Sequence, residues 1–418
     1  MINEETLYDL GTAAKKAAKE LAQLPSQAKN RALNTMAQAL RTKLADILAA
    51  NQKDIAKTHD SGRPESFIER MTLTEERVES MAAGLEKVAQ LADPIGSSHK
   101  SWINEDGLEI SQRTVPLGVI GIIYESRPNV TADAVGLCFK SGNAVILRGG
   151  KETINSNLAI LNVLKSALRK SGITEDAVAY IDNPDRQLAQ KFMQMNDYVD
   201  CLIPRGSQGL IQNVVKQATI PTIETGVGND HLYVHKDADL DKALAILING
   251  KTQRVSVCNA LETLLVDQAI AKDFLPRVAE QLADYNVLVH ADQAALTYFP
   301  DGQLAKPQDY AQEFLDYEIA IKVVADYDEA INHIDQYSTQ HTEVIVTENY
   351  SVAQDFINAI DAAVVNVNAS SRFSDGEKFG FGGEIGISTQ KLHARGPMGL
   401  DALTSYKYVV LGSGQIRQ

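Results

Sequence analysis

The sequence is poor in cysteine, which limits how the protein can be stabilised. Its three cysteines are an odd number and too few to cross-link 418 residues, so disulfides are not the main stabilising device. We expect a reducing, cytoplasmic setting. No CxxC motif occurs, and the one HxxxH motif, His231 to His235, lies in a strand-like run that places the two rings about 13 Å apart. A metal site is therefore not expected.

Long apolar runs and an excess of positive charge are also lacking. No uncharged run approaches the roughly 18 residues that span a bilayer, and the start, MINEETLYDL, has neither the basic nor the apolar region of an export signal. The chain has 40 Lys and Arg against 54 Asp and Glu, a net charge of -14 that repels nucleic acid and anionic membranes. We expect a soluble protein that binds neither.

What the sequence does contain is typical of a globular protein, with 44% hydrophobic and 22% charged residues. Residues 4–59 show mostly the apolar spacing of amphipathic helices. The pattern breaks at HDSGRPES and resumes through MAAGLEKVAQLAD. These segments predict a layer of helices packed on another part of the molecule.

From residue 114, short β-branched runs alternate with helical patterns. The expected strands are VPLGVIGIIYE, NAVILRG, AVAYID, YVDCLIPRG and PTIET. The expected helices are NVTADAVGLCFKSG, INSNLAILNVLKSALRKSG, PDRQLAQKFMQM and SQGLIQNVVKQA. Most of the strands are continuously apolar, as expected when both faces of a sheet are covered. The alternation predicts a doubly wound parallel sheet, which binds ligands beyond the carboxyl ends of its strands.

A second α/β unit begins near residue 237. A helical pattern over HKDADLDKALAILINGKTQR precedes the strand-like runs ALETLLVD, NVLVHA, EIAIKVVAD, TEVIVTE and AAVVNVNA. Two further β-like segments, 100–113 and 398–418, belong to neither sheet. Because unpaired strand edges favour subunit association, we expect these segments to form a small oligomerisation element of a homodimer or homotetramer.

The three cysteines differ in their surroundings. Cys138 lies in the helical run VGLCFK and Cys201 in a buried-looking strand, so both are expected to fill the core. Cys258, in RVSVCNALE, follows a polar turn and precedes an apolar strand, where a side chain can face a cleft. A nearby cation, for which Arg254 is a candidate, would favour the thiolate. Position alone leaves two interpretations of Cys258 open, a reactive nucleophile or an inert core residue.

Two glycine-containing segments are candidate phosphate sites. No GxGxxG motif follows the first strand, whose turn reads YESRPNV. The segments RGGKE at 148–152 and PRGSQG at 204–209 each follow a strand and open a helix. Backbone amides at a helix start attract anions, so both could seat the phosphates and ribose of a dinucleotide. Each segment alone is weak evidence, because glycine is common at such junctions.

In chain order these pieces resemble the aldehyde dehydrogenase superfamily: a strand, a turn ending in Pro128-Asn129, a helix, GNAVILRGGKE and a later cysteine. Within it, the sequence resembles the family of gamma-glutamyl phosphate reductases, also called glutamate-5-semialdehyde dehydrogenases. The resemblance runs from about residue 7 to the end and includes VPLGVIGIIYESRPNVTADAV, IDNPDR, LIPRG, VADYDEAINHIDQYSTQHTEVI and STQKLHARGPMGLDALTSYKY.

The resemblance implies a fold and an activity. The fold is an aldehyde-dehydrogenase-like pair of doubly wound α/β domains. Residues 1–99 and 114–236, with 367–397 returning, would form the Rossmann-like NADP-binding domain, and 237–366 the catalytic domain. The activity is NADPH-dependent reduction of L-glutamate 5-phosphate to the 5-semialdehyde with release of phosphate, the second step of proline biosynthesis from glutamate.

The resemblance also assigns catalytic roles. Cys258 would attack the acyl phosphate and form a thioester. Asn129 and the backbone N–H of Cys258 would stabilise the negative charge that develops on the carbonyl oxygen. A second interpretation of Asn129 remains open, because an asparagine after proline can simply cap the following helix.

The same resemblance indicates which residues bind NADPH or NADP. Lys151 matches a lysine that contacts the adenosine ribose, and a lysine can also bind a 2′-phosphate. Gly206 and Ser207 match the seat of the pyrophosphate and ribose. Glu224 lies where hydrolytic members keep a base that activates water, which this reaction does not require. The full expected set is Arg148, Gly149, Lys151, Arg205, Gly206, Ser207 and Glu224.

The small-molecule substrate would be held by arginines, because it carries a carboxylate and a phosphate. The candidates are Arg127, Arg254 and Arg372, with no assignment of which arginine meets which group.

Four further positions carry no assigned role. The family commonly has proline where Val255 stands and cysteine where Asp230 stands. Val255 could loosen the turn before the nucleophile, and Asp230 places a negative charge near the expected cleft. His231 and His341 lie in matching stretches and are expected to be ordinary hydrogen-bonded histidines.

Two other functions compete with the reductase. A hydrolytic aldehyde dehydrogenase acting on another aldehyde would need only water, whereas the reductase run backwards needs phosphate. A non-catalytic oligomeric binding protein of the same fold would have no use for Cys258, Asn129 and Lys151 together. Because acyl phosphates hydrolyse readily, we also expect coupling to glutamate 5-kinase, the enzyme that makes the substrate.

Overall fold

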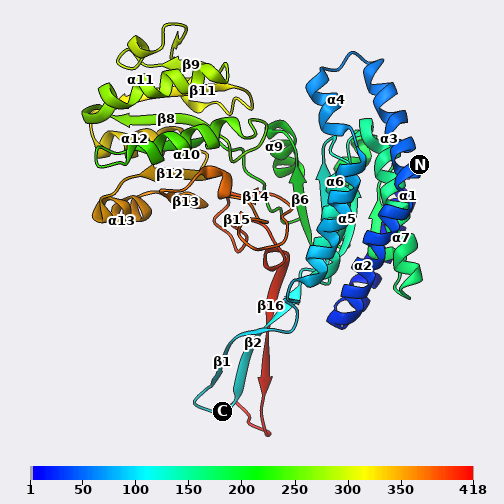
Figure 1. The fold of residues 1–418 in the computed structure, drawn as a ribbon. Helices are drawn as coiled ribbons and strands as arrows, with labels where there is room; N and C mark the ends of the chain where they lie inside the picture. The colour runs from blue at the N-terminus through cyan, green and yellow to red at the C-terminus, as the bar shows by residue number, and fades with distance from the viewer. Residues whose placement is uncertain (1–2, 418) are drawn as a thin grey trace. The chain divides into compact units, whose positions relative to one another are not determined.

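The computed structural model describes residues 3–417 and divides into two compact units, each with its own parallel sheet (Figure 1). The first unit comprises residues 3–225, 380–386 and 398–417. The second unit comprises residues 226–379 and 387–397.

The first unit begins with the predicted layer of helices. Its helices are α1 (Glu4–Leu21), α2 (Ser26–Thr42), α3 (Leu44–His59), α4 (Glu65–Met71) and α5 (Glu75–Gln90). Asn3 starts α1 with a capping box, and the side chain of Thr74 accepts from the backbone N–H of Arg77 at the start of α5. The short α4 falls where the sequence pattern indicated only a break.

A four-stranded parallel sheet forms the core of the first unit. Its order is β5-β4-β3-β6, with β3 (Val119–Tyr124), β4 (Ala144–Arg148), β5 (Val178–Tyr180) and β6 (Cys201–Arg205). The connecting helices are α6 (Asn129–Lys140), α7 (Ile154–Lys170), α8 (Arg186–Phe192) and α9 (Gln208–Gln217), with 3₁₀ turns η1 (Lys151–Thr153) and η2 (Glu175–Ala177). The expected strand PTIET contributes only a single bridge, between Leu202 and Thr222.

A small antiparallel sheet also belongs to the first unit. The strands β1 (Ser98–Ile103) and β2 (Glu109–Pro116) form the predicted hairpin, and β16 (Thr404–Leu411) pairs with β2 along its whole length. The order β1-β2-β16 joins segments about 300 residues apart in the sequence (Figure 1). The two segments expected outside the main sheets therefore pair with each other.

The second unit contains a seven-stranded parallel sheet, in the order β10-β9-β11-β8-β7-β12-β13. Its strands are β7 (Asp230–Val234), β8 (Leu261–Asp267), β9 (Leu288–Ala291), β10 (Gln303–Leu304), β11 (Glu318–Val324), β12 (Thr342–Val346) and β13 (Val364–Val367). Two short strands, β14 (Ile387–Ser388) and β15 (Gly396–Pro397), form a separate antiparallel pair. Short 3₁₀ turns η3 (Leu296–Tyr298), η4 (Asp309–Ala311) and η5 (Ser371–Phe373) complete the connections, while η6 (Asp401–Leu403) leads into β16 of the first unit.

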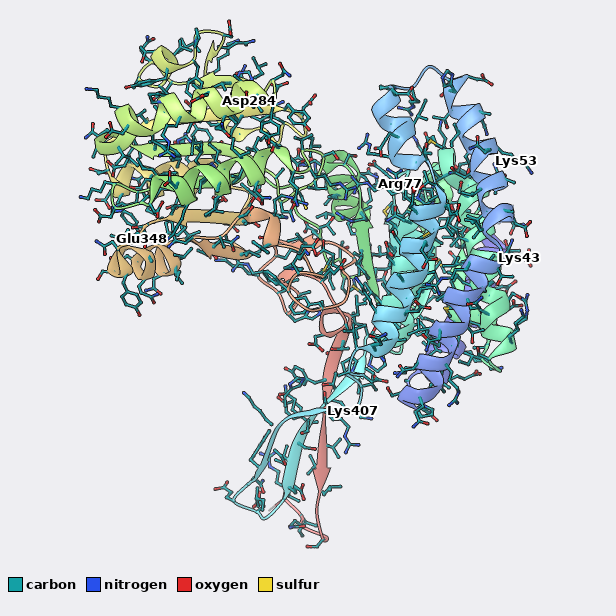
Figure 2. All side chains as sticks on the ribbon, viewed as in Figure 1. Lys43, Lys53, Arg77, Asp284, Glu348 and Lys407 are labelled. Atoms are coloured by element: carbon teal, nitrogen blue, oxygen red, sulfur yellow. The ribbon has the colours of Figure 1, made fainter. Side chains whose placement is uncertain are left out.

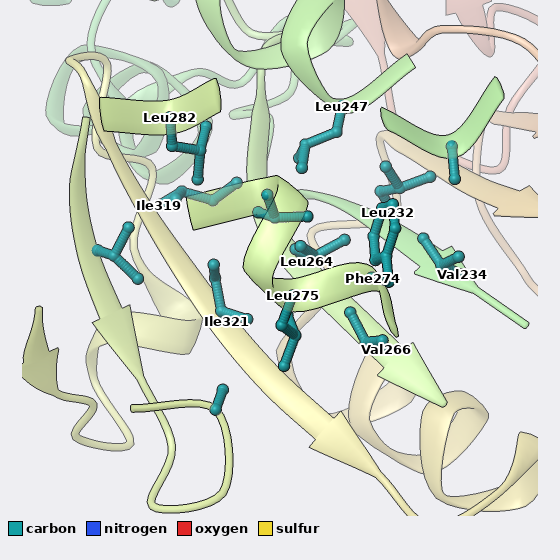
Figure 3. Packing of buried hydrophobic residues seen from close by; sticks show 14 of the residues in the cluster. Leu232, Val234, Leu247, Leu264, Val266, Phe274, Leu275, Leu282, Ile319 and Ile321 are labelled. Atoms are coloured by element: carbon teal, nitrogen blue, oxygen red, sulfur yellow. The ribbon is translucent and has the colours of Figure 1, made fainter. Parts of the chain in front are cut away.

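Helices cover both faces of this sheet, as predicted for a doubly wound fold. They are α10 (Leu240–Thr252), α11 (Gln268–Asp284), α12 (Tyr327–Tyr337) and α13 (Tyr350–Ala359). Alternate residues of one strand enter different cores, since Leu232 and Val234 pack with α10 and α11 while Tyr233 packs with α12 and α13. Figure 3 shows the first of these cores, where Phe274 and Leu275 of α11 meet Leu264 of β8. Each such side chain stabilises the unit by about 1.5–3 kcal/mol when it is fully buried.

Two expected domain boundaries require correction. The first unit was expected to run to residue 236, but β7 is hydrogen-bonded between β8 and β12 and so belongs to the second sheet. The segment 367–397 was expected to return to the first unit, yet only residues 380–386 do so. Both errors arise because strand partners are chosen in three dimensions and are invisible in a local pattern.

Charged side chains are exposed on both units. Lys43 and Lys53 lie exposed on the first unit and Glu348 on the second, all labelled in Figure 2. Among residues 3–417, no helix is both long and apolar enough to cross a membrane.

Candidate active site

Cys258 is the one cysteine of the three that is partly exposed. It lies in the connection between α10 and β8, whereas Cys138 and Cys201 are buried in α6 and β6. Burial raises the pKa of the Cys138 thiol far above its ordinary range and that of Cys201 to about 12. Both therefore behave as the predicted core residues, and the placement of Cys258 fits the nucleophile interpretation better than the core one.

Close packing fixes the backbone around Cys258. A Cβ atom added to Gly228 would lie 1.5 Å from the carbonyl oxygen of Cys258, so only glycine fits there. The next residue, Asn259, donates from Nδ2 to the carbonyl of Ser374 at 2.8 Å, and its own carbonyl accepts from Ser371 Oγ at 2.7 Å. The loop that carries the thiol is thus held on both sides.

A buried acid–base pair lies beside Cys258. His341 Nδ1 is 3.1 Å from Asp230 Oδ1, and both side chains are fully buried. Burial lowers the pKa of His341, but Asp230 and Cys258 outweigh this and raise it well above its usual range. Burial raises the pKa of Asp230 to about 7, against the opposing influence of His341. His341 is therefore more than the ordinary hydrogen-bonded histidine expected from sequence.

Asp230 and His341 reach one place because their strands are neighbours. Asp230 opens β7, His341 immediately precedes β12, and Cys258 lies just before β8. Since β8, β7 and β12 are adjacent and parallel, their amino ends meet at one edge of the sheet.

A second buried pair joins the same two strands. His231 Nδ1 lies 3.0 Å from Glu343 Oε2, and the two residues are direct partners in the register of β7 and β12. Ser338 Oγ donates to the other carboxylate oxygen at 2.5 Å. His231 is thus the hydrogen-bonded structural histidine that the sequence predicted.

The candidate arginines divide between the units. Arg254 and Arg372 both belong to the second unit, and Arg372 interacts electrostatically with Arg254, Cys258 and Asp230. Burial and the neighbouring Arg254 lower the pKa of Arg372. Its Nε donates to Gln253 at 3.0 Å, while its buried Nη1 makes no hydrogen bond within residues 3–417. Arg127 belongs to the first unit, in the turn between β3 and α6.

Asn129 is the first residue of α6, and its capping interpretation is wrong. Pro128 occupies the N-cap position, and no side chain caps this helix. Instead, Asn129 Nδ2 donates to Asp133 Oδ2 at 3.2 Å, one turn further along. Burial raises the pKa of Asp133 to about 6, against this hydrogen bond. The amide has two hydrogens, so one donor remains available for another acceptor.

The first candidate cofactor segment follows β4. Lys151 is exposed at the start of η1, where a ligand can reach it. Arg148 turns away from this role, since its Nη2 donates to the carbonyls of Pro184 and Asp185 at 3.2 Å each. A Cβ on Gly149 would lie 2.3 Å from Asn157 Nδ2, so this glycine permits close packing of the turn.

The second cofactor segment follows β6, at the same edge of the sheet. Ser207 caps α9, and a Cβ on Gly206 would meet the Glu125 carboxylate at 2.7 Å. Glu125 accepts from both the backbone N–H and the hydroxyl of Ser207 at 2.8 Å. The start of α9 therefore already binds an anionic group, as its amide donors favour. Arg205 accepts through its carbonyl from the N–H of Glu125 at 3.0 Å.

Glu125 was missed by the sequence analysis. It stands directly after β3, in the turn YESRPNV that was dismissed for lacking glycines. Its position at the carboxyl end of the strand beside β6 was the available signal. Glu224 lies in the first unit, half-buried, near the point where the chain passes into the second unit.

Metal chemistry has no support in the described residues. Between residues 3 and 417, no three side chains of His, Cys, Asp or Glu gather in a manner that could hold a metal ion.

The chain is similar to known proteins over almost its whole length. The model of the aldehyde dehydrogenase family matches residues 2–301. Gamma-glutamyl phosphate reductase of Ligilactobacillus salivarius is 52% identical over 413 residues, which cover 99% of each protein. The crystal structure of gamma-glutamyl phosphate reductase from Thermotoga maritima has a TM-score of 0.95 and 47% identity, covering 99% of this chain and 100% of that one.

A more distant neighbour confirms the fold alone. An acetylating aldehyde dehydrogenase from Geobacillus thermoglucosidasius is 16% identical with a TM-score of 0.72, over 99% of this chain and 98% of that one. The chain therefore belongs to the aldehyde dehydrogenase family and, within it, to the gamma-glutamyl phosphate reductases.

Proposed function

We propose that this chain reduces L-glutamate 5-phosphate to L-glutamate 5-semialdehyde with NADPH, releasing phosphate. The observation that carries the proposal is the partly exposed Cys258 thiol beside the buried pair of Asp230 and His341, in a chain that matches gamma-glutamyl phosphate reductases from end to end. A pathway that makes proline from glutamate would use this reaction. We place it in the cytoplasm, alongside the kinase that supplies the substrate.

The first unit offers donors that fit a nicotinamide dinucleotide. The exposed Lys151 amine suits a ribose hydroxyl or a 2′-phosphate, which supports NADP over NAD. The N–H and hydroxyl of Ser207 already hold the Glu125 carboxylate, so they suit an anionic or hydroxyl-bearing ligand. We assign Gly149, Arg205, Gly206 and Glu224 to the surroundings of this ligand and Arg148 to the support of its loop.

Cys258 performs the covalent chemistry in this proposal. Its thiolate sulfur bonds to the acyl carbon, the bond from that carbon to the phosphate oxygen breaks, and phosphate leaves with the electron pair. The Cys258 thioester would accept the hydride that reduced nicotinamide supplies when it is bound, which gives the anion of a thiohemiacetal. The carbon–sulfur bond then breaks, and Cys258 returns to the thiolate as the aldehyde leaves.

The remaining roles follow from charge. The free N–H groups of Asn129 and of the Cys258 backbone stabilise the oxyanion, at about 3 kcal/mol for each donor. The unpartnered Nη1 of Arg372 and the exposed Arg254 suit the phosphate or carboxylate of the substrate. Arg127 remains the third candidate for these groups.

We further propose that the sheet β1-β2-β16 joins subunits into a homodimer or homotetramer. Its exposed side chains include Trp102, Ile103, Tyr406, Tyr408 and Val410, and apolar side chains on an open sheet favour association. Tyr408→Glu with Val410→Glu should lower the mass measured by light scattering to that of a smaller assembly. An unchanged mass would contradict this role of the sheet.

The activity is tested by running the reaction backwards. We expect the purified protein to reduce NADP in the presence of glutamate 5-semialdehyde and phosphate, with no reaction when phosphate is omitted. Cys258→Ala should abolish the absorbance rise of reduced nicotinamide. Asn129→Ala should lower kcat by about 10²- to 10³-fold, because one oxyanion donor is lost. Aldehyde oxidation without phosphate would instead identify a hydrolytic enzyme, and no oxidation at all a binding protein.

A further inference from the structure

An acid, a base and a thiol gather at the amino edge of the second sheet. These three side chains lie at the starts of neighbouring strands, Asp230 at β7, Cys258 before β8 and His341 before β12. More than 100 residues of sequence separate Asp230 from His341. The proposed mechanism uses only the thiol, so the other two side chains lack a function.

The geometry makes Asp230 and His341 dependent on each other. The contact from Asp230 Oδ1 to His341 Nδ1 is 3.1 Å, and neither side chain is exposed. Apart from the contact with His341, neither carboxylate oxygen of Asp230 has a hydrogen-bond donor within residues 3–417. A buried carboxylate without donors is costly unless a cation balances it. His341 is positioned to be that cation.

The remaining ring nitrogen of His341 is free to take a proton. Its Nδ1 is shared between Asp230 and Thr342 Oγ1, at 2.9 Å from the latter. Its Nε2 is buried and makes no hydrogen bond in the described chain. The Cys258 backbone packs directly against Gly228, two residues before Asp230, and the Cys258 thiol interacts with this imidazole.

Other charges near the trio do not replace His341. Glu343 already has its own partners, since it lies 3.0 Å from His231 Nδ1 and accepts from Ser338 Oγ. Arg372 interacts with Cys258 and Asp230, but its Nε is held by Gln253. Arg254 is exposed to solvent, which screens its charge.

The helix ends at this edge also disfavour additional negative charge. The helices α10 and α12 end at Thr252 and Tyr337, a few residues before Cys258 and His341. A helix carboxyl end carries about half a negative charge, which disfavours a thiolate nearby. No helix begins directly before Cys258 to offset this.

We propose that Asp230 and His341 are positioning residues that hold Cys258 as a thiolate. The proton leaves the Cys258 sulfur and binds His341 Nε2, so the S–H bond is replaced by an N–H bond. The net charge of the three side chains remains minus one. This inference rests on the proposed role of Cys258 as nucleophile, and it gives a reason for an acidic side chain at position 230.

The proposal also bears on the choice between reduction and hydrolysis. An imidazolium has no free lone pair, so His341 in this state cannot activate water against the thioester. Asp230 therefore favours a long-lived thioester that awaits the hydride.

The test measures how fast iodoacetamide alkylates Cys258 between pH 5 and pH 10, by mass spectrometry of the peptide that contains it. In His341→Gln, we expect the midpoint of the rate against pH to rise by about one to three units, as for loss of an opposite charge nearby. At neutral pH this shift corresponds to at most a roughly 1000-fold slower alkylation, and to a smaller factor the further the wild-type midpoint lies below pH 7. Asp230→Asn should shift the midpoint in the same direction.

A matched control is available in the same sheet. His290 is a largely buried histidine of β9, 3.0 Å from Glu318, and β11 separates its strand from β8. His290→Gln should leave the midpoint unchanged. Circular dichroism verifies that each variant is folded, and the near-isosteric Asp230→Asn covers the case in which His341→Gln does not fold.

An unmoved midpoint in a folded variant would overturn the inference. Because alkylation needs no substrate, the outcome is independent of the proposed reaction. A low midpoint in the wild type without any reductase activity would refute the proposed function alone. An active reductase whose midpoint ignores both substitutions would refute the inference alone.

Discussion

The two parallel sheets place their candidate site residues at opposite ends of their strands. In the first unit, Glu125, Gly149 and Gly206 follow β3, β4 and β6, at the carboxyl edge. In the second unit, Asp230, Cys258 and His341 lie at the amino edge of β7, β8 and β12. The general rule that open parallel sheets bind ligands beyond their carboxyl ends describes only the first of these.

The two edges of a parallel sheet offer different backbone groups to a ligand. At a carboxyl edge the next helix begins, as α9 does at Gln208, and its backbone N–H groups bind anions without charged side chains. At an amino edge a helix has just ended, as α10 does at Thr252, so carbonyl groups prevail there. Reactive chemistry at that edge must take its positive charge from side chains, here His341 and two arginines.

The two units also differ in how completely they bury a lysine–carboxylate pair. In the second sheet, Lys251 at the end of α10 and Glu262 in β8 form a fully buried pair at 2.7 Å. The nearest counterpart in the first unit is Lys29 with Asp93 at 2.9 Å, where the carboxylate keeps 12% exposure.

The largest expected difference between the two units is in the reactivity of their cysteine thiols. We expect iodoacetamide to label Cys258 in the native protein at least about 1000-fold faster than Cys138 or Cys201, because a thiol whose pKa is near 12 is rarely a thiolate at neutral pH. Mass spectrometry of the three peptides over time measures the rates. After denaturation in urea the three should react alike. If Cys201 were labelled as fast as Cys258 in the native protein, the expected difference in thiol reactivity between the two units would be wrong.

A smaller effect concerns the two buried lysines. Lys251→Met should destabilise the second unit by about 3–5 kcal/mol, because it leaves Glu262 buried and unpaired. Lys29→Met should cost less, since water reaches Asp93. Hydrogen exchange of β8 and β4 amides reports the two losses separately.

The stability that Lys251→Met loses should depend on pH. Burial raises the pKa of Glu262 to about 8, although Lys251 opposes the rise. Without Lys251 the folded state holds this proton more tightly than the unfolded chain does. Stability of Lys251→Met should therefore fall further as pH rises from 6 to 9. Adding Glu262→Leu should restore much of the loss, and full additivity of the two changes would contradict the pairing.

Local patterns in the sequence predicted much of this molecule. The continuous apolar runs of β3, β4, β6 and β8 were recognisable because both faces of each strand are buried. Cys258 could be separated from Cys138 and Cys201 because an element boundary exposes a side chain. Lys151 and Ser207 became candidates for cofactor binding because a strand leading into a helix is a contiguous signal.

Other features could not be predicted, because they depend on strand order. Asp230 and His341 are 3.1 Å apart only because β7 and β12 are neighbours, although strands β8 to β11 intervene in the chain. The contact of Glu125 with Ser207 similarly needs β3 beside β6. The domain boundary was misplaced for the same reason, since the membership of β7 is decided by its partners.

The sequence by itself determined the fold class and the family of this protein and made Cys258 the candidate nucleophile, because each of these depends on contiguous segments. Only the tertiary structure decided which buried charges meet, that Asn129 serves Asp133 and not the helix cap, and which edge of each sheet carries chemistry. The physical reason is that hydrophobic periodicity acts locally along the chain, whereas the electrostatic partner of a buried charge is fixed by packing in three dimensions.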